Sequence, residues 1–279
     1  MKGIAAMISF PGLGLEFNID PVAFTVFGKP IFWYGIIISL ALIVNIIWAM
    51  RDAGKFGFKS DDIVDFVFYV VPAAVVGARL YYVIFKWQDY AGNPIEAIKI
   101  WNGGLAIYGA VIAGIITAWI FARVKRINPL KLCDFCAPFL VLGQAIGRWG
   151  NFINCEAYGE YTNLPWRMEI PALDGMGVMS VHPTFLYESL WNISVFIFLM
   201  LFRNRSKKEG EVFFLYLIMY GLGRFWIEGL RADSLMIGSF KVSQLLSLLA
   251  VVVFSGVLFK GRILKKRNPV TANESTHNG

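Results

Sequence analysis

One short segment holds most of the residue types that could do chemistry on a phosphate ester. Residues 147–159 read G-R-W-G-N-F-I-N-C-E-A-Y-G, and the polar side chains and closing glycine are Arg148, Asn151, Asn154, Glu156 and Gly159. An arginine guanidinium is a planar fork of donors that suits phosphate, and asparagine amides can donate to ester or phosphate oxygens. Glycine lets the backbone approach a ligand closely. A helix-ending turn in which Arg148 pairs with Glu156 explains the same residues equally well.

A second group of charges lies at residues 224–231, which read R-F-W-I-E-G-L-R. Arg224 and Glu228 are four residues apart, so on a helix they share a face with Arg231. A structural ion pair explains Arg224 and Glu228, but it leaves Arg231 without a role. Together with Arg148, these arginines could converge on an anionic head group.

The remaining candidates are single residues in aromatic or glycine-rich surroundings. They are Tyr34 in W-Y-G, Arg79 in G-A-R-L, Tyr108 after W-N-G-G, Asp134, and both His182 and Glu188 in H-P-T-F-L-Y-E. Tyr34 taken alone fits an aromatic anchor at a membrane surface. A histidine at a helix mouth is more often structural than catalytic, and Thr184 could cap the helix that follows. Glu188 needs a partner if it is buried, and Arg79 could supply one.

The elements that position these residues must be membrane helices. The chain has 279 residues, of which 57% are hydrophobic and 16% charged, whereas a soluble domain is about 45–50% apolar and about 25% charged. A spanning helix needs about 20 mostly apolar residues. Seven segments qualify, which predicts an all-α polytopic membrane protein; they are residues 31–50, 63–85, 104–122, 132–146, 184–202, 212–230 and 242–259.

Loop charges predict the orientation of these spans. Sixteen lysines and arginines fall in the loops of one side and eight on the other, and cytoplasmic loops carry the excess. The N-terminus and the 147–183 connection are therefore expected outside, and the C-terminus inside. We divide the chain into an interfacial arm (1–30), a membrane body (31–260) and a basic, disordered cytoplasmic tail (261–279). The net charge of +7 indicates topology and attraction to anionic lipid rather than nucleic-acid binding.

The cysteines and histidines indicate neither a metal site nor a disulfide framework. Cys133 and Cys136 form a C-x-x-C, which in a soluble protein would suggest redox chemistry or half a zinc site. Here the segment is apolar and the only histidines are His182 and His277, so we expect plain apolar packing and predict neither metal nor cofactor.

Taken together, the motifs resemble those of the prolipoprotein diacylglyceryl transferase family. The resemblance includes G-R-x-G-N-F-I-N-x-E-x-x-G at 147–159 and R-F-x-x-E-x-x-R at 224–231. W-Y-G at 33–35, G-A-R-L at 77–80, W-x-G-G at 101–104 and H-P-T-x-L-Y-E at 182–188 follow the family order. This resemblance implies a transferase of the bacterial plasma membrane. Its substrates would be phosphatidylglycerol and a preprolipoprotein, whose lipobox cysteine becomes a thioether as glycerol phosphate leaves.

The resemblance also implies roles for individual residues. Arg148 and Arg224 would hold the phosphate, and Asn151 would orient the head group. Around them, Tyr34, Asn154, Glu156, Gly159, Glu228 and Arg231 would line or tune the site, with Arg79, Asp134, His182 and Glu188 in support.

This chain departs from the family pattern at two positions. Tyr108 stands where the family commonly has a histidine proposed as the base, and a phenol with a reference pKa near 10 is a poor base at neutral pH. A carboxylate or water takes the proton instead, or the thiol reacts with electrostatic help alone, or nearby arginines deprotonate Tyr108. We expect Tyr108 to position substrate by hydrogen bonding. The second departure is Phe185, where a glutamine is frequent.

Two other classes of protein fit some of these features. A transporter or channel would account for intramembrane charges such as Asp65 and Glu188, although the charges gather toward the outer half and no internal repeat is evident. A non-catalytic lipid scaffold would need no reactive geometry.

Overall fold

The structure is a computed structural model that describes residues 6–172, 177–232, 234, 236–238 and 240–267. The chain divides into two compact units. Residues 1–41 and 140–279 form the first unit, and residues 42–139 form the second unit. Two long helices pass from one unit to the other, because the divisions fall inside α1 (Trp33–Ala53) and α5 (Pro129–Ile153).

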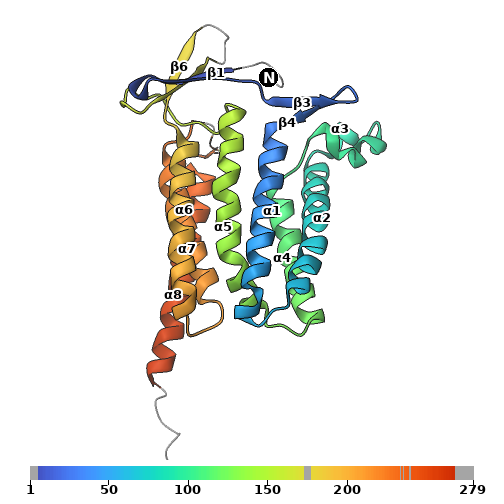
Figure 1. The fold of residues 1–279 in the computed structure, drawn as a ribbon, viewed down its shortest axis with the longest axis vertical. Helices are drawn as coiled ribbons and strands as arrows, with labels where there is room; N and C mark the ends of the chain where they lie inside the picture. The colour runs from blue at the N-terminus through green and yellow to red at the C-terminus, as the bar shows by residue number, and fades with distance from the viewer. Residues whose placement is uncertain (1–5, 173–176, 233, 235, 239, 268–279) are drawn as a thin grey trace, which may run out of the picture. The chain divides into compact units, whose positions relative to one another are not determined.

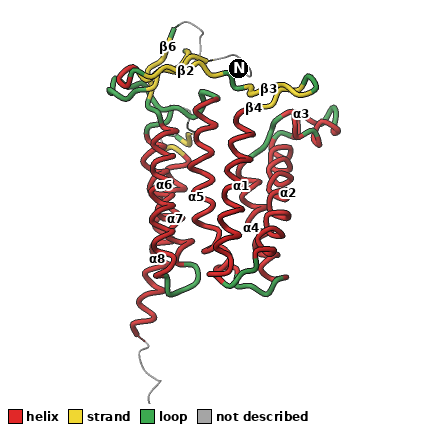
Figure 2. The backbone as a smooth tube through the Cα atoms, in the orientation of Figure 1, coloured by secondary structure: helices red, strands yellow, loops and turns green. Residues whose placement is uncertain are grey.

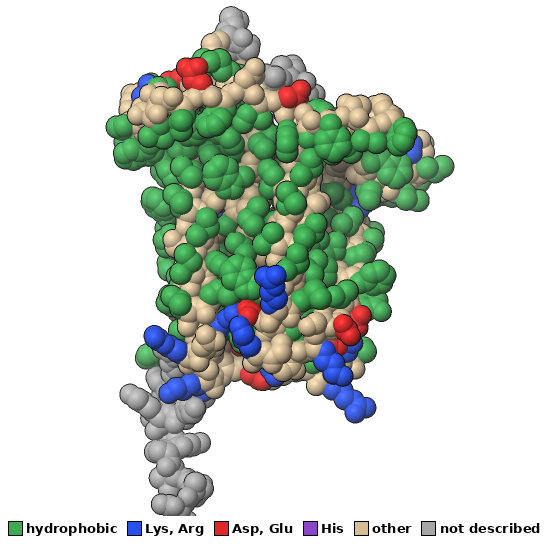
Figure 3. All heavy atoms as spheres, in the orientation of Figure 1, with side chains coloured by type: hydrophobic (Ala, Val, Ile, Leu, Met, Phe, Trp, Pro, Cys, Tyr) green, Lys and Arg blue, Asp and Glu red, His purple; other side chains and the backbone are tan. Residues whose placement is uncertain are grey.

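Seven helices in the described part of the chain are long and apolar enough to cross a membrane. Besides α1 and α5 they are α2 (Ser60–Phe85), α4 (Ile107–Val124), α6 (Thr184–Phe202), α7 (Glu211–Gly229) and α8 (Val242–Arg267). Hydrophobic side chains cover the helices on the face drawn in Figure 3, as the bilayer interior requires. The predicted fold class, a polytopic membrane protein of about seven helices, is confirmed.

Two predicted boundaries differ from the structure. Helix α5 extends to Ile153, so Arg148 and Asn151 lie on its last turns, and the connection that we expected to start at residue 147 starts after Ile153. We expected residues 261–279 to form a disordered tail. This prediction was wrong for residues 261–267, which continue α8. Residues 268–279 lie outside the described part of the chain.

The outer segments contain strands that the sequence analysis did not anticipate. The segment expected to be an interfacial arm forms two antiparallel hairpins, β1 (Ala6–Phe10) with β2 (Leu15–Ile19) and β3 (Val22–Val26) with β4 (Lys29–Phe32). The 147–183 segment supplies β5 (Met168–Pro171) and β6 (Val178–Val181), and a sheet forms in the order β2-β1-β5-β6. Figure 2 shows this sheet at one end of the helices of the first unit.

Strand β1 has one face on the core of the first unit. Its alternating pattern buries Ile8 and Phe10 and leaves Met7 exposed. Beneath the sheet, the ring of Phe152 at the end of α5 stacks on Phe185 at the start of α6, with centroids 4.6 Å apart. Phe185 therefore fills an apolar core that fixes the ends of two site-bearing helices, rather than lying at a polar mouth.

In the first unit, α7 packs against both α6 and α8; Figure 1 draws these helices in yellow-orange to red. A two-stranded hairpin, β7 (Met236–Ile237) and β8 (Phe240–Lys241), leads into α8. In the second unit, α2 packs along α4, and the short helix α3 (Trp87–Tyr90) follows α2. Cys136 packs against the core of the second unit, as the sequence analysis expected.

Candidate active site

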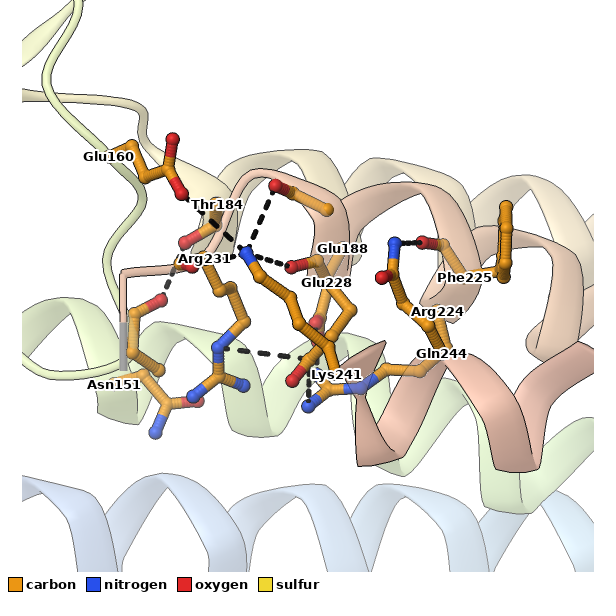
Figure 4. A network of polar contacts seen from close by, with 12 residues as sticks. Asn151, Glu160, Thr184, Glu188, Arg224, Phe225, Glu228, Arg231, Lys241 and Gln244 are labelled. Carbon is orange, nitrogen blue, oxygen red and sulfur yellow. Dashed lines mark hydrogen bonds and ion pairs between the residues drawn. The ribbon is translucent and has the colours of Figure 1, made fainter. Parts of the chain in front are cut away.

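Five charged residues of the first unit form a continuous alternating series, which we call the ion chain. It runs Arg148–Glu188–Arg224–Glu228–Arg231, from the end of α5 through α6 to the end of α7. Arg148 Nε contacts one oxygen of Glu188, and Arg224 Nη1 lies 2.6 Å from the other. Arg224 Nη2 lies 2.5 Å from Glu228 Oε2, and Arg231 Nε lies 4.0 Å from the same oxygen (Figure 4). Three arginines against two glutamates leave one net positive charge.

The carboxylates of the ion chain are among the most buried polar groups of the protein. Glu188 is 5% exposed and Glu228 2% exposed. A buried carboxylate is costly without a partner, so each is held between two guanidinium groups. The predicted pairing of Arg224 with Glu228 is confirmed, whereas Glu188 pairs with Arg148 and Arg224 rather than with Arg79.

Hydrogen bonds between helices hold the ion chain in place. The Trp149 indole N–H donates to the Ser189 hydroxyl at 3.2 Å, and that hydroxyl donates to the Ala145 carbonyl at 3.0 Å, so α5 is joined to α6. The Trp191 indole donates to the Met219 carbonyl at 2.9 Å and joins α6 to α7. The three helices that carry the arginines and glutamates are thereby fixed relative to one another.

The 147–159 segment extends the ion chain toward solvent. Arg148 Nη1 donates to Asn151 Oδ1 at 3.2 Å, and Asn151 Nδ2 donates to Glu156 Oε1 at 2.8 Å. Asn154 makes a longer contact of 3.5 Å with the same oxygen. Glu156 is thus linked to Arg148 through an amide, and the carboxylate that contacts Arg148 directly is Glu188. Glu156 is exposed, in contrast to the two carboxylates of the ion chain.

The backbone around Glu156 is strained. Cys155 and Ala157 have φ values of 49° and 57°, a left-handed conformation that costs a residue with a Cβ roughly 1–2 kcal/mol. The Glu156 amide donates to the Asn151 carbonyl at 3.0 Å, and the Thr184 hydroxyl donates to the Ala157 carbonyl at 2.5 Å. The expected cap role of Thr184 is therefore wrong: its hydroxyl holds the strained turn that presents Glu156. Strain of this kind gathers at functional sites.

Tyr34 lies against the same segment. It is the second residue of α1, and a Cβ placed on Gly150 would come within 2.5 Å of its ring. The absence of a side chain at Gly150 therefore lets the Tyr34 ring lie against the backbone of α5. The structure thus places the Tyr34 ring against Gly150, within the segment that was joined to it only through the family resemblance.

Gly159 lies where three segments meet. Its amide donates to the His182 carbonyl at 3.0 Å, and its backbone pairs with that of Arg231. A Cβ at this position would lie 2.5 Å from His182 Cβ and 2.9 Å from the Leu230 carbonyl oxygen. His182 itself contacts the Tyr187 hydroxyl at 3.3 Å through Nδ1. Gly159 and His182 therefore fix the backbone that carries Arg231, which is the structural role expected of the histidine.

Lys241 is a residue of this region that was not predicted from the sequence. Lys241 was counted only as a loop charge, yet its ammonium donates to three backbone carbonyls at the end of α7. No local signal marks it, because the β7–β8 hairpin brings it back to α7.

Three predicted site residues belong to the second unit, where their surroundings are described separately. Arg79 is buried and donates to the backbone carbonyls of Ala97, Glu96, Gly103 and Gly104 at 2.6–3.0 Å. These four bonds fix the segment that leads into α4, and they explain why Arg79 is not the partner of Glu188. Tyr108 is the second residue of α4, is half exposed and lies near the ring of Tyr81. Asp134 lies on the first part of α5.

Fixed guanidinium groups in surroundings of low dielectric can bind an anion and stabilise negative charge as it develops. Among the described residues, no group of histidines, cysteines and acids has the arrangement of a metal site. The seven helices and the ion chain define a polytopic membrane protein with an anion-binding candidate site at the ends of α5, α6 and α7.

Comparison with known proteins identifies the family. A family model described as prolipoprotein diacylglyceryl transferase matches residues 21–260. A phosphatidylglycerol–prolipoprotein diacylglyceryl transferase from Clostridioides difficile is 44% identical over 92% of this chain and 100% of its own length. Enzymes of the same name from Finegoldia magna (47%; 88% of this chain, 98% of the relative) and Enterococcus faecalis (46%; 90% and 92%) are also similar. The chain belongs to the prolipoprotein diacylglyceryl transferase family and is a transferase.

Proposed function

We propose that this protein transfers the diacylglyceryl group of phosphatidylglycerol to the thiol of a lipobox cysteine in a preprolipoprotein. The thiolate sulfur attacks the diacylglyceryl carbon that is bonded to the phosphate oxygen. A carbon–sulfur bond forms, the carbon–oxygen bond breaks, and glycerol phosphate leaves with the electron pair. Family membership supports the reaction, and the ion chain is the single structural observation that carries it to this chain's own residues.

The ion chain suits a reaction in which a phosphate diester is cleaved and the departing glycerol phosphate gains negative charge. Arg148 and Arg224 are partly accessible, and each is already oriented by Glu188. A guanidinium has five N–H donors, and Arg148 contacts Glu188 through Nε and Asn151 through Nη1. We assign Arg148 and Arg224 to hold the phosphate and to stabilise the charge that the leaving oxygen gains.

The residues around the arginines have supporting roles in this proposal. Asn151 orients the lipid head group, because its amide already bridges Arg148 and Glu156. Tyr34 and Asn154 line the pocket, and Glu228 with Arg231 tunes its charge. The thiol has a reference pKa of about 8–9 and must react as thiolate, so a base is needed. Glu156 is the exposed carboxylate of the site and is our candidate for accepting that proton.

We place the site at the outer face of a bacterial plasma membrane, with the N-terminus outside and the C-terminus in the cytoplasm. Loop charges support this orientation. In the first unit the ion chain lies at the start of α6, whereas Arg203, Arg205, Lys207 and Lys208 follow the end of the same helix. Figure 3 shows lysine and arginine side chains gathered near the ends of the helices remote from the strands. The secreted preprolipoprotein would present its cysteine on the outer side.

The test is product formation by purified protein. The protein is mixed in detergent with phosphatidylglycerol and a lipobox peptide, and the thioether-linked peptide is followed by mass spectrometry. We expect product with phosphatidylglycerol and none with phosphatidylcholine. Arg148→Ala should lower the rate by about 100-fold or more, while the control Arg205→Ala, an exposed arginine at the far end of α6, should keep it.

Two outcomes would overturn the proposal. One is the absence of product from folded wild-type protein, and the other is an undiminished rate in Arg148→Ala. Solute flux into liposomes without thioether product would favour a transporter instead.

A further inference from the structure

Lys241 makes a dense set of polar contacts next to the ion chain, within the first unit. Its ammonium nitrogen lies 3.1 Å from the carbonyl oxygens of Glu228 and Gly229 and 2.8 Å from that of Arg231. It also lies 3.6 Å from a carboxylate oxygen of Glu160. Figure 4 shows the lysine reaching across the end of α7 to these groups. Its side chain is 16% exposed, so the contacts are mostly shielded from water.

The contacts of Lys241 join three segments, two of which carry or adjoin site residues. The lysine itself precedes α8, the three carbonyls belong to the last turn of α7 and the residues after it, and Glu160 follows Gly159. The Glu160 amide also donates to the Leu230 carbonyl at 2.7 Å. The Glu160 segment and the end of α7 are thus joined by a backbone hydrogen bond and, in addition, by the side chain of Lys241.

The backbone groups bound by Lys241 belong to the last link of the ion chain. Glu228 and Arg231 form that link through their side chains, and the lysine holds the carbonyls of both. The last carbonyls of a helix have no partner within it and carry a partial negative charge of about half an elementary charge. At the end of α7, this partial charge lies beside the arginines that would bind an anionic lipid.

We propose that Lys241 is a positioning residue for the anionic head group, acting through the end of α7. Its ammonium fixes the backbone of Glu228 and Arg231 and offsets the negative end of the helix, so that the phosphate meets arginines rather than exposed carbonyls. The lysine acts through these groups and need not touch the substrate. This inference rests on the proposed function, because it assumes that the bound lipid carries a phosphate at the ion chain.

The proposal predicts a specific kinetic pattern. Lys241→Met keeps an apolar stem as far as Cε but removes the ammonium group with its charge and three donors. We expect its KM for phosphatidylglycerol to rise on the order of tenfold, with a smaller change in kcat. Lys241→Arg keeps the charge and can donate to several carbonyls, so it should recover most of the loss. Lys29→Met is the matched control, because Lys29 is an exposed lysine of β4, and its KM should stay at the wild-type value.

The experiment measures KM and kcat for these proteins in mixed micelles at several mole fractions of phosphatidylglycerol. A wild-type KM for Lys241→Met would overturn the proposal, and so would an equal loss in Lys241→Met and Lys241→Arg, since charge would then not matter. A fall in kcat alone would place the lysine in the chemical step and also overturn the positioning role. Where Lys241→Met fails to fold, Glu160→Gln and Lys241→Arg carry the same comparison. An inactive wild-type protein would count against the proposed function, whereas an active one with unaffected variants would count against this inference alone.

Discussion

Glu188 lies between two arginines: its Oε1 is 2.6 Å from Arg224 Nη1, and its Oε2 contacts Nε of Arg148. One carboxylate from α6 therefore orients the guanidinium groups of α5 and α7. This arrangement leaves each arginine fixed before any substrate arrives. Preorganised charges of this kind need no rearrangement when negative charge develops on a leaving group.

Removal of the charge of Glu188 should cost stability as well as activity. Glu188→Gln keeps the shape of the side chain but removes the buried negative charge that the partly buried guanidinium groups of Arg148 and Arg224 share. Breaking a buried ion pair costs about 3–5 kcal/mol, and the retained hydrogen bonds of glutamine should bring the loss toward the lower end. Tryptophan fluorescence in a fixed detergent would follow denaturant unfolding. Glu16→Gln, at an exposed position of β2, should unfold within about 0.5 kcal/mol of wild type. Equal midpoints for the two variants would show that the ion chain does not stabilise the fold.

Gly159 should tolerate no side chain. In Gly159→Ala the new Cβ would approach His182 Cβ at 2.5 Å and the Leu230 carbonyl oxygen at 2.9 Å, so the backbone that pairs with Arg231 must move. We expect a loss of stability of about 1–3 kcal/mol and a fall in transfer rate. Gly35→Ala, from the W-Y-G motif, is the control, because nothing lies within 4 Å of a Cβ there. Should both alanine variants behave alike, close approach would not be the reason for glycine at 159.

The pattern of the sequence was sufficient to predict the helices. Each span is about 20 apolar residues, and the bilayer imposes that length on any helix that crosses it. The pairing of Arg224 with Glu228 was equally predictable, because it follows from a spacing of four on one helix. Both predictions depend only on local geometry.

Contacts between distant segments were not predictable in this way. Arg79 was a reasonable partner for Glu188 by charge alone, but its guanidinium is used by four carbonyls of the segment that leads into α4. Lys241 was missed because its partners are backbone carbonyls, which any residue supplies. The strands before α1 were missed because their short alternating runs resemble apolar segments lying on a membrane. In each case the contact depends on the tertiary structure, which brings segments that are distant in the sequence together.

Tyr108 stands where the resemblance places a base, and we predict that its hydroxyl positions substrate instead. A phenol hydroxyl donates a hydrogen bond readily and is a poor acceptor for the proton of a thiol. Tyr108→Phe should lower kcat/KM by about tenfold or less, the worth of one hydrogen bond. The pH–rate profile should keep its shape. A loss as large as that of Arg148→Ala, or a shifted basic limb, would show that Tyr108 takes part in proton transfer.

Cys155 precedes the candidate base Glu156 in a site that would alkylate a thiol, yet it should not react there. Burial raises its pKa to about 11 from an ordinary value of 9.0. A raised thiol pKa means less thiolate at a given pH, so near pH 8 the reactive fraction is about 100-fold below that of an ordinary cysteine.

Iodoacetamide labelling of Cys155 can be followed by mass in a Cys133→Ala, Cys136→Ala background, where Cys155 is the remaining cysteine of the sequence. Its rate should rise about tenfold per pH unit from pH 8 to 10 and level off near pH 11, whereas the unfolded protein should level off about two units lower. A folded-state midpoint near pH 9 would contradict this prediction. At neutral pH Cys155 should therefore stay protonated and unalkylated, as expected if the attacking thiol belongs to the substrate in the proposed reaction.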